Sequence, residues 1–344
     1  MSEAEVLFER RGSVGLITLN RPKALNALTH DMCLRMKAQL DMWADDPSID
    51  SVVVRGAGDR AFCAGGDIRA LYESGKAGTP YVLDFYRDEY ILNATIKHYP
   101  KPYIAMIHGI VMGGGVGVSV HGRYRVAEET ITFAMPETGI GLFPDVGGSY
   151  FLPRTPGEIG MYLALTGTRL KAADCLYAGV ATHVVPPGRS TVLIDCLEIG
   201  RPPEEEFSPY GRIEGRAPLD VQRAWIDEVF SGTTVEAILA SLDSHGTQWA
   251  AETAKTIRSK SPTATKIAFR QIREGKKLDF DDCMRMEYRL VNRVVAGKDF
   301  YEGVRATIID KDQSPKWQPA RLEDVSDKDI DAYFAPLGDR ELKL

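Results

Sequence analysis

The sequence predicts a mixed α/β fold, in which strands and helices alternate in the first half and helices alone follow in the second. Short runs of β-branched and other apolar residues are typical of buried strands, and they occur at residues 14–19, 51–55 and 103–107. Beyond residue 210 the apolar residues recur at the spacing of amphipathic helices. Alternating strands and helices favour parallel strand pairing through crossover helices.

In the first half, the residues that flank each element support its prediction. The strand at 14–19 stops at the turn sequence Asn20-Arg21-Pro22. A helix is expected to begin at Thr29, because apolar side chains then follow at helical spacing: Met32, Met36, Leu40 and Trp43. Glycines end the strand at 51–55, and the strand at 103–107 leads into a glycine-rich turn and a further apolar run.

The character of the chain changes near residues 186–208. Proline-rich segments bracket a stretch that we interpret as a surface connection. We therefore divide the chain into a core at 1–190, a connecting segment at 191–210 and a helical region at 211–344. Within the helical region, amphipathic helices are expected at 221–230, 235–242 and 247–258.

Composition excludes several classes of protein. Lys and Arg number 42 against 48 for Asp and Glu, which gives a net charge of −6 and argues against a nucleic-acid or membrane-surface partner. The five cysteines lie far apart with no CxxC pair, so neither a zinc site nor a disulfide framework is indicated. Reduced thiols and an acidic N-terminus without a signal peptide lead us to expect a cytoplasmic protein.

Two glycine-rich loops, at residues 62–69 and 108–117, each follow a predicted strand and precede a predicted helix. Glycine permits close approach to a backbone N–H, and N–H groups at a helix start are unpaired. Two such loops facing each other would form an oxyanion hole, although a packing or turn role is also open. Neither the GxGxxG spacing of dinucleotide sites nor the Gly-Lys-Ser/Thr of phosphate loops is present in these loops.

A third segment, at residues 135–149, carries Glu137 and Asp145 among Gly, Pro and apolar residues with no cation nearby in sequence. Desolvation raises the pKa of a carboxyl group and suits it to proton transfer or nucleophilic attack. The residues alone also allow two solvated loop acids.

These three segments, in this order, resemble the crotonase (enoyl-CoA hydratase/isomerase) superfamily. Its further landmark here is the segment at 20–28, and the segment at 136–150 resembles the 3-hydroxyisobutyryl-CoA hydrolase branch. The second half adds branch-like motifs at 261–263, 286–289, 299–305 and 315–317. The resemblance implies a crotonase-type spiral of repeated ββα units, followed by a helical C-terminal region that covers an acyl-CoA cleft. The 286–289 helix is expected to pack against or line that cleft, with its charges otherwise forming a solvated face.

The resemblance also implies roles for individual residues. The backbone N–H groups of Gly66 and Gly114 match the oxyanion donors, Glu137 the catalytic glutamate and Asp145 the second acid near the substrate hydroxyl. Glu89 matches a further acid that contacts the substrate. Lys23, Ala24 and Ala64 fall at positions where members of the superfamily contact CoA.

One departure from the hydratase pattern favours hydrolysis. Hydratases carry a second glutamate three residues after the second oxyanion glycine, and that position is Gly117 here. The expected reaction is hydrolysis of 3-hydroxyisobutyryl-CoA to 3-hydroxyisobutyrate and CoA, a step of valine catabolism. Glu137 would act as nucleophile or general base, with Asp145 assisting. No metal or redox cofactor is expected, since CoA is part of the substrate.

Two alternatives stay open: an enoyl-CoA hydratase or isomerase, and a non-catalytic acyl-CoA-binding module. The exact acyl group is also open, because one methyl group is worth only about 1–3 kcal/mol in an apolar pocket. A homo-oligomer is implied by the superfamily, without a defined number of subunits.

Overall fold

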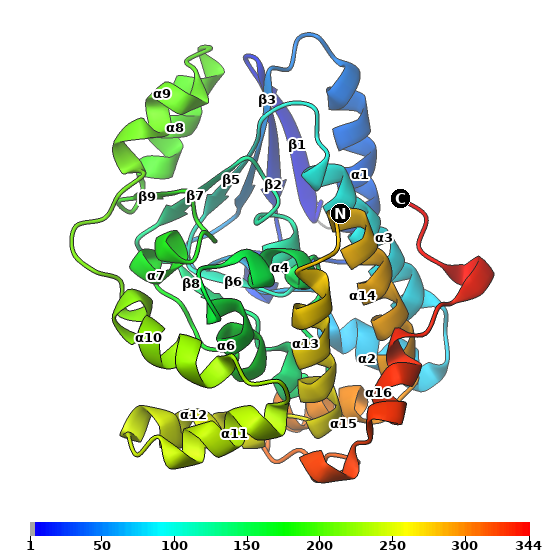
Figure 1. Ribbon diagram of the computed structural model, residues 1–344. Helices are drawn as coiled ribbons and strands as arrows, with labels where there is room; N and C mark the ends of the chain where they lie inside the picture. Colours follow the sequence, from blue (N-terminus) through cyan, green and yellow to red (C-terminus); the bar gives the residue numbers. More distant parts are fainter. Residues whose placement is uncertain (1–3) are drawn as a thin grey trace. The chain divides into compact units, whose positions relative to one another are not determined.

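The computed structural model describes residues 4–344 and confirms the mixed α/β class (Figure 1). The chain forms two compact units that interleave along the sequence. The first contains the residues up to Asp67, Ile91–Ala134 and Arg169–Val221, and the second contains Ile68–Tyr90, Met135–Thr168 and Gln222–Leu344. The sequence-based division into 1–190, 191–210 and 211–344 describes where composition changes, and it stays a prediction.

The first unit is built on a six-stranded sheet with the order β1-β2-β3-β5-β7-β9. The strands β1 and β2 pair antiparallel, and the other four neighbouring pairs are parallel, as the alternation of strands and helices predicts. Their bounds are Val6–Arg11, Val14–Leu19, Ser51–Gly56, Tyr103–Ile107, Tyr124–Glu128 and His183–Val185. Every residue of β2 and β5 is buried, which explains their continuous apolar runs.

A second, three-stranded parallel sheet carries the glycine loops. Its order is β4-β6-β8, with bounds Ala61–Cys63, Ile110–Met112 and Thr132–Ala134. Along the chain, each strand of the small sheet follows one of the large sheet: β4 follows β3, β6 follows β5 and β8 follows β7. Helical segments follow each pair, so the expected repeat of ββα units is confirmed.

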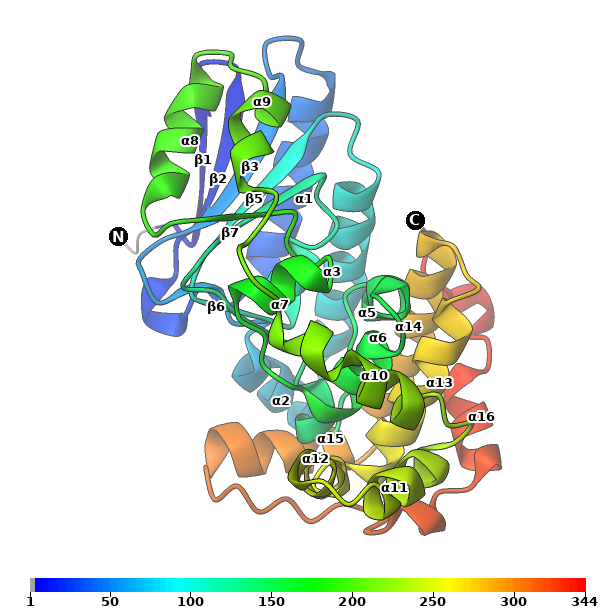
Figure 2. The same cartoon turned by 60° about the vertical axis from the view of Figure 1, so that its left-hand side comes forward.

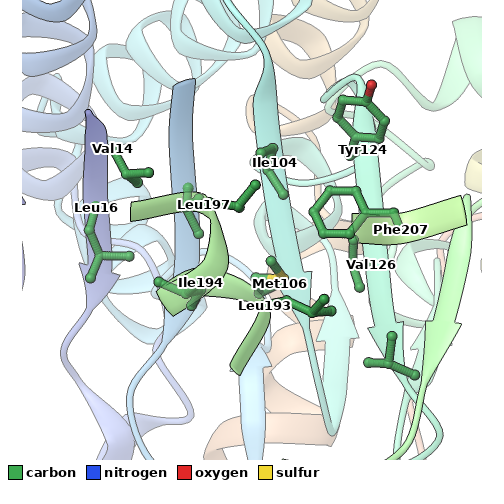
Figure 3. Packing of buried hydrophobic residues seen from close by; sticks show 12 residues of the cluster. Val14, Leu16, Ile104, Met106, Tyr124, Val126, Leu193, Ile194, Leu197 and Phe207 are labelled. Atoms are coloured by element: carbon green, nitrogen blue, oxygen red, sulfur yellow. The ribbon is translucent and has the colours of Figure 1, made fainter. Parts of the chain in front are cut away.

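Residues 191–210, predicted as a connecting segment, differ from that prediction. They form most of α8 (Arg189–Glu198) and all of α9 (Pro203–Phe207), which lie beside the large sheet (Figure 2). The apolar side chains of both helices pack on that sheet (Figure 3). Leu193, Ile194 and Phe207 are buried against residues such as Ile104 and Val126. Of the prolines that suggested a surface loop, Pro186, Pro187 and Pro202 precede the helices and Pro203 is the first residue of α9, where proline is tolerated.

The helix α1 (His30–Asp45) begins as predicted, because the Thr29 hydroxyl accepts the N–H of Met32 at 3.3 Å. The first unit also contains α7 (Ala172–Tyr177).

The remaining helices belong wholly or partly to the second unit. They are α2 (Ile68–Ala77), α3 (Tyr81–Lys97), α5 (Gly148–Phe151), α6 (Ile159–Thr166), α10 (Pro218–Phe230), α11 (Val235–Ser244), α12 (Gln248–Arg258), α13 (Pro262–Gly275), α14 (Phe280–Val294), α15 (Asp299–Val304) and α16 (Asp327–Phe334). The helices predicted at 221–230, 235–242 and 247–258 are thus confirmed as α10, α11 and α12. Within residues 4–344, no helix has the length and apolarity that a membrane span requires.

Close contact between β4 and the short helix α4 (Gly114–Gly117), which follows β6, requires glycine at position 115. A Cβ atom placed on Gly115 would lie 2.2 Å from the carbonyl oxygen of Cys63. We expect Gly115→Ala to lower the free energy of unfolding by about 1–3 kcal/mol, because backbone must move to admit the methyl group. Equilibrium urea unfolding measures this loss.

The matched control is Gly211→Ala, where the nearest neighbour of an added Cβ is a His183 carbon at 3.8 Å. Its stability is expected to stay within about 0.5 kcal/mol of the parent. Equal losses in the two variants would contradict the packing argument.

Candidate functional site

In the loop after β4, the backbone N–H of Gly66 points away from the neighbouring segment, which contains Leu28. The N–H of Leu28 donates to the Gly65 carbonyl at 2.8 Å, and the N–H of Asp67 donates to the Leu28 carbonyl at 2.9 Å. Leu28 therefore bridges the residues on both sides of Gly66 in a parallel arrangement. In that arrangement the polar groups of the central residue point to the opposite side. The Gly66 N–H thus points away from Leu28.

The loop after β6 places Gly114 at the first position of the short helix α4 (Gly114–Gly117). The first N–H groups of a helix have no acceptor within it. A Cβ built on Gly65 would lie 3.8 Å from the Gly114 nitrogen, so the two glycine loops are neighbours within the first unit. The structure therefore brings together the two loops that the sequence predicts. That both N–H groups point at a single oxygen stays a prediction.

The residues implied in CoA contact lie in the same unit. Lys23 and Ala24 belong to the exposed 3-10 turn Pro22–Ala24, and Ala64 lies half-buried directly after β4. The N–H of Ala64 donates to the Leu25 carbonyl at 3.0 Å, which ties the loop after β4 to the segment that follows this turn. Their contact with CoA stays a prediction.

The second unit gathers the predicted acids in its interior. Glu137 begins the 3-10 turn Glu137–Ile140, Asp145 precedes α5, and Glu89 lies in α3. Their exposed fractions are 5%, 3% and 2%. The alternative of solvated loop acids is therefore excluded for Glu137 and Asp145.

Asp145 has a defined hydrogen-bond partner, whereas Glu137 and Glu89 each keep one oxygen that accepts no hydrogen bond from the described residues. The Tyr90 hydroxyl donates to Asp145 Oδ2 at 2.8 Å. Within residues 4–344, Glu137 Oε2, Glu89 Oε1 and the Tyr86 hydroxyl are buried without a hydrogen-bond partner. Buried polar atoms are usually paired, so these three atoms retain hydrogen-bonding capacity that the described residues do not use.

Burial raises the pKa of every acid in this cluster. The pKa of Glu137 lies well above 4.5, because of desolvation and then the charge of Asp145. The pKa of Glu89 is raised for the same two reasons, and desolvation raises the pKa of Asp145 to about 7, against hydrogen bonding from Tyr90 that lowers it. Near neutral pH the cluster can therefore hold a proton or release one.

Sequence reasoning missed two members of this cluster, Glu287 and Lys260. Glu287 lies in the 286–289 motif, whose charges were expected to face solvent, yet its side chain is fully buried. Desolvation raises the pKa of Glu287 to about 8. The charge of Lys260 lowers the pKa of Glu137, while burial lowers the pKa of Lys260 itself. Both residues lie more than 100 positions from Glu137 in the chain, so no local spacing indicated them.

The described residues contain no group of three or more His, Cys, Asp or Glu side chains placed to hold a metal ion. The expectation that no cofactor is needed stays a prediction.

The chain is similar over almost its whole length to several known proteins. The enoyl-CoA hydratase/isomerase family model matches residues 14–334. The mitochondrial 3-hydroxyisobutyryl-CoA hydrolase of Danio rerio is 50% identical over 351 residues, which cover 99% of this chain and 92% of that protein. The protein of the same name from Rattus norvegicus is 50% identical over 353 residues, with coverage of 99% and 91%. A carnitinyl-CoA dehydratase structure from Mycobacterium thermoresistibile has a TM-score of 0.94, 43% identity and 99% coverage of both chains.

These relatives contradict the expected location. The cytoplasmic expectation rested on the cysteines and the N-terminal residues, whereas both relatives named above are mitochondrial enzymes. The expectation of a cytoplasmic protein is therefore wrong.

The acid cluster predicts an unusual pH dependence of stability. Because the pKa of Asp145 is about 7 in the folded chain and about 3.9 in an unfolded one, the folded state holds a proton that the unfolded state has lost. The free energy of unfolding therefore falls as pH rises through that window. Replacing Asp145→Asn removes this loss, so the stability of the variant relative to the parent should increase with pH, by at most about 1.4 kcal/mol per pH unit.

Urea unfolding of both proteins at several pH values between about 4 and 7 measures this difference. Asn retains an oxygen that accepts from Tyr90, so the local hydrogen bond is preserved. Parallel stability curves would contradict the assigned pKa of Asp145.

Proposed function

Because this chain belongs to the enoyl-CoA hydratase/isomerase family, in its 3-hydroxyisobutyryl-CoA hydrolase branch, we propose that it hydrolyses 3-hydroxyisobutyryl-CoA to 3-hydroxyisobutyrate and CoA. The observation that carries the proposal is the buried acid cluster around Glu137 and Asp145. Binding alone needs no such cluster, and burying ionisable acids costs stability. A non-catalytic acyl-CoA-binding module is therefore disfavoured.

In the proposed mechanism, Glu137 acts on the thioester carbonyl by one of two routes. As a nucleophile, its carboxylate forms a bond to the carbonyl carbon, the C–S bond breaks, and CoA leaves as the thiolate. Water then hydrolyses the resulting anhydride. As a general base, it takes a proton from a water molecule that attacks the same carbon; the C–S bond then breaks and CoA leaves as the thiolate, which takes up a proton. The unpartnered Glu137 Oε2 supports either route, since it is buried and unoccupied by protein donors.

The N–H groups of Gly66 and Gly114 are proposed to stabilise the negative charge that develops on the carbonyl oxygen. The start of α4 supports this, because the N–H of Gly114 is unpaired within its helix. Loss of a single donor of this kind typically costs about 100- to 1,000-fold in rate.

Asp145 and Glu89 are proposed to bind the 3-hydroxyl group of the substrate. Their raised pKa values allow each to donate as well as accept a hydrogen bond near neutral pH. Tyr86 lies among the same acids with an unpartnered hydroxyl, and is proposed to bind the same end of the substrate. CoA contacts by Lys23, Ala24 and Ala64, a homo-oligomer, and turnover without a cofactor are part of the same proposal.

The second candidate is an enoyl-CoA hydratase or dehydratase, favoured by the name of the 43% identical carnitinyl-CoA dehydratase. Addition of water across a double bond by the two-glutamate route requires a carboxylate three residues after Gly114. That position, Gly117, is a buried glycine at the end of α4. Hydrolysis is the better-supported reaction for this reason.

The central experiment replaces Glu137→Gln. A thiol-reactive dye is expected to report CoA release by the parent protein from 3-hydroxyisobutyryl-CoA. The variant should be slower by about 100- to 10,000-fold, because it lacks the base or nucleophile. Binding of the intact thioester, measured by calorimetry, should be retained.

The matched control is Glu129→Gln, at an exposed carboxylate, which should leave turnover unchanged. Crotonyl-CoA serves as the test for hydratase activity, through loss of its conjugated absorbance. Consumption of crotonyl-CoA without thiol release from either substrate would establish the second candidate. Wild-type thiol release by Glu137→Gln would refute the role of Glu137.

A second prediction concerns the acid limb of the pH–rate profile. Since the charge of Lys260 lowers the pKa of Glu137, Lys260→Met should raise that pKa further. The acid limb of kcat/KM should then move to higher pH, by about one unit. Lys255→Met, on the exposed side of α12, is the control and should not move the limb. A limb that moves to lower pH, or stays in place, would exclude Lys260 as a partner of Glu137.

A further inference from the structure

Glu287 makes three hydrogen bonds to the loop that carries Asp145. Its Oε2 accepts the N–H of Gly147 at 2.8 Å, and its Oε1 accepts the N–H of Ser149 at 2.9 Å and the Ser149 hydroxyl at 2.5 Å. The side chain comes from α14, about 140 residues further along the chain, and it is fully buried. Both oxygens of this carboxylate are therefore occupied by donors from a single loop.

The loop needs such support because its backbone is in an unfavourable conformation. Val146 has a φ of +51° and Gly147 has a φ of +88°. Glycine adopts positive φ readily, but a β-branched residue such as valine does so rarely. A conformation of this kind persists only when surrounding contacts impose it.

Contacts from three helices impose this conformation. The Tyr90 hydroxyl from α3 binds the Asp145 carboxylate, and the Gln271 amide from α13 donates to the Pro144 carbonyl. Glu287 from α14 binds the two N–H groups on the other side of the left-handed turn. Asp145 therefore lies between two hydrogen-bonded backbone groups, the Pro144 carbonyl and the Gly147 N–H. The Glu287 contacts hold the backbone that follows Asp145 in its left-handed conformation.

We propose that Glu287 is a positioning residue, which fixes the Val146–Gly147 turn and thereby orients the Asp145 carboxylate for the reaction. In its carboxylate form Glu287 accepts from all three loop groups, whereas an amide would present an NH₂ group to one of them. The catalytic part of the proposal rests on the proposed function, whereas the structural part can be tested without any activity.

The test is a double-mutant cycle of Glu287→Gln and Asp145→Asn, measured by thiol release from 3-hydroxyisobutyryl-CoA. Glu287→Gln alone is expected to lower kcat by about 10- to 100-fold, since a displacement of about 1 Å has effects of that size. The KM should change by less than about threefold, because the loop orients a reacting group. In the Asp145→Asn background the same change should cost less than about threefold, as expected for residues that act through one another.

Two further variants make the result interpretable. Ser149→Ala removes only the hydroxyl donor, and should show the same pattern with a smaller loss of kcat. It replaces Glu287→Gln in the cycle if that variant does not fold. Glu341→Gln is the matched control: Glu341 accepts the N–H of Leu337 at 2.8 Å and pairs with Arg289 of the same helix α14. Its kcat should be unchanged.

Amide hydrogen exchange provides the measurement that does not depend on activity. The amides of Gly147 and Ser149 should be protected in the parent and in Asp145→Asn, and should lose protection in Glu287→Gln. An equal loss of kcat from Glu287→Gln in both backgrounds, or unchanged exchange at these two amides, would overturn the proposal. Absence of thiol release by the parent protein would refute the proposed function instead, and the exchange data would then decide whether Glu287 holds the loop.

Discussion

The burial of four carboxyl groups in the second unit is the constraint on which the rest of the account depends. Glu89, Glu137, Asp145 and Glu287 are each at most 5% exposed. Charged carboxylates are costly to remove from water, and neighbouring ones repel each other. Lys260, whose charge lowers the pKa of Glu137, is itself half-buried. The acids therefore keep protons at a pH where exposed acids have lost them.

The same constraint explains how one cluster offers different chemistry at each position. Glu287 is saturated by three donors, and Asp145 is bound by Tyr90. Glu137 and Glu89 instead retain an unpartnered oxygen each. Hydrogen bonding thus engages both oxygens of Glu287 and one oxygen of Asp145, and it leaves one oxygen each of Glu137 and Glu89 without a protein donor. Sites of this kind trade stability for function, because the free groups are desolvated without compensation.

Much of this architecture can be predicted from the sequence, because it depends on residues that are close to one another along the chain. Buried parallel strands require continuous apolar runs, Thr29 caps α1, and the tight contact at Gly115 excludes any side chain. Glu137 and Asp145 were recognisable because they stand alone among apolar and glycine residues, and the order of the glycine loops carried the family resemblance.

The features that escaped prediction depend on contacts between distant segments. In the sequence, Glu287 has the pattern of a solvent-facing acid on an amphipathic helix. In the structure, α14 contacts the loop at 145–149 and Glu287 binds two of its N–H groups. Helix α8 was not predicted, because the prolines on either side of it indicated a surface connection. Leu193 and Leu197 nevertheless have the spacing of a buried helical face. The effect of the Lys260 charge on the pKa of Glu137 had no local signal in the sequence.

The most direct test of the account is a ¹³C NMR titration of the chain labelled at the glutamate side-chain carboxyl carbon, with Glu137→Gln to assign the Glu137 resonance. The account predicts that this resonance titrates with a midpoint well above 4.5, and that a second buried glutamate, absent in Glu287→Gln, titrates near pH 8. A Glu137 resonance that titrates at or below 4.5 would contradict the claim that burial prepares this residue for catalysis.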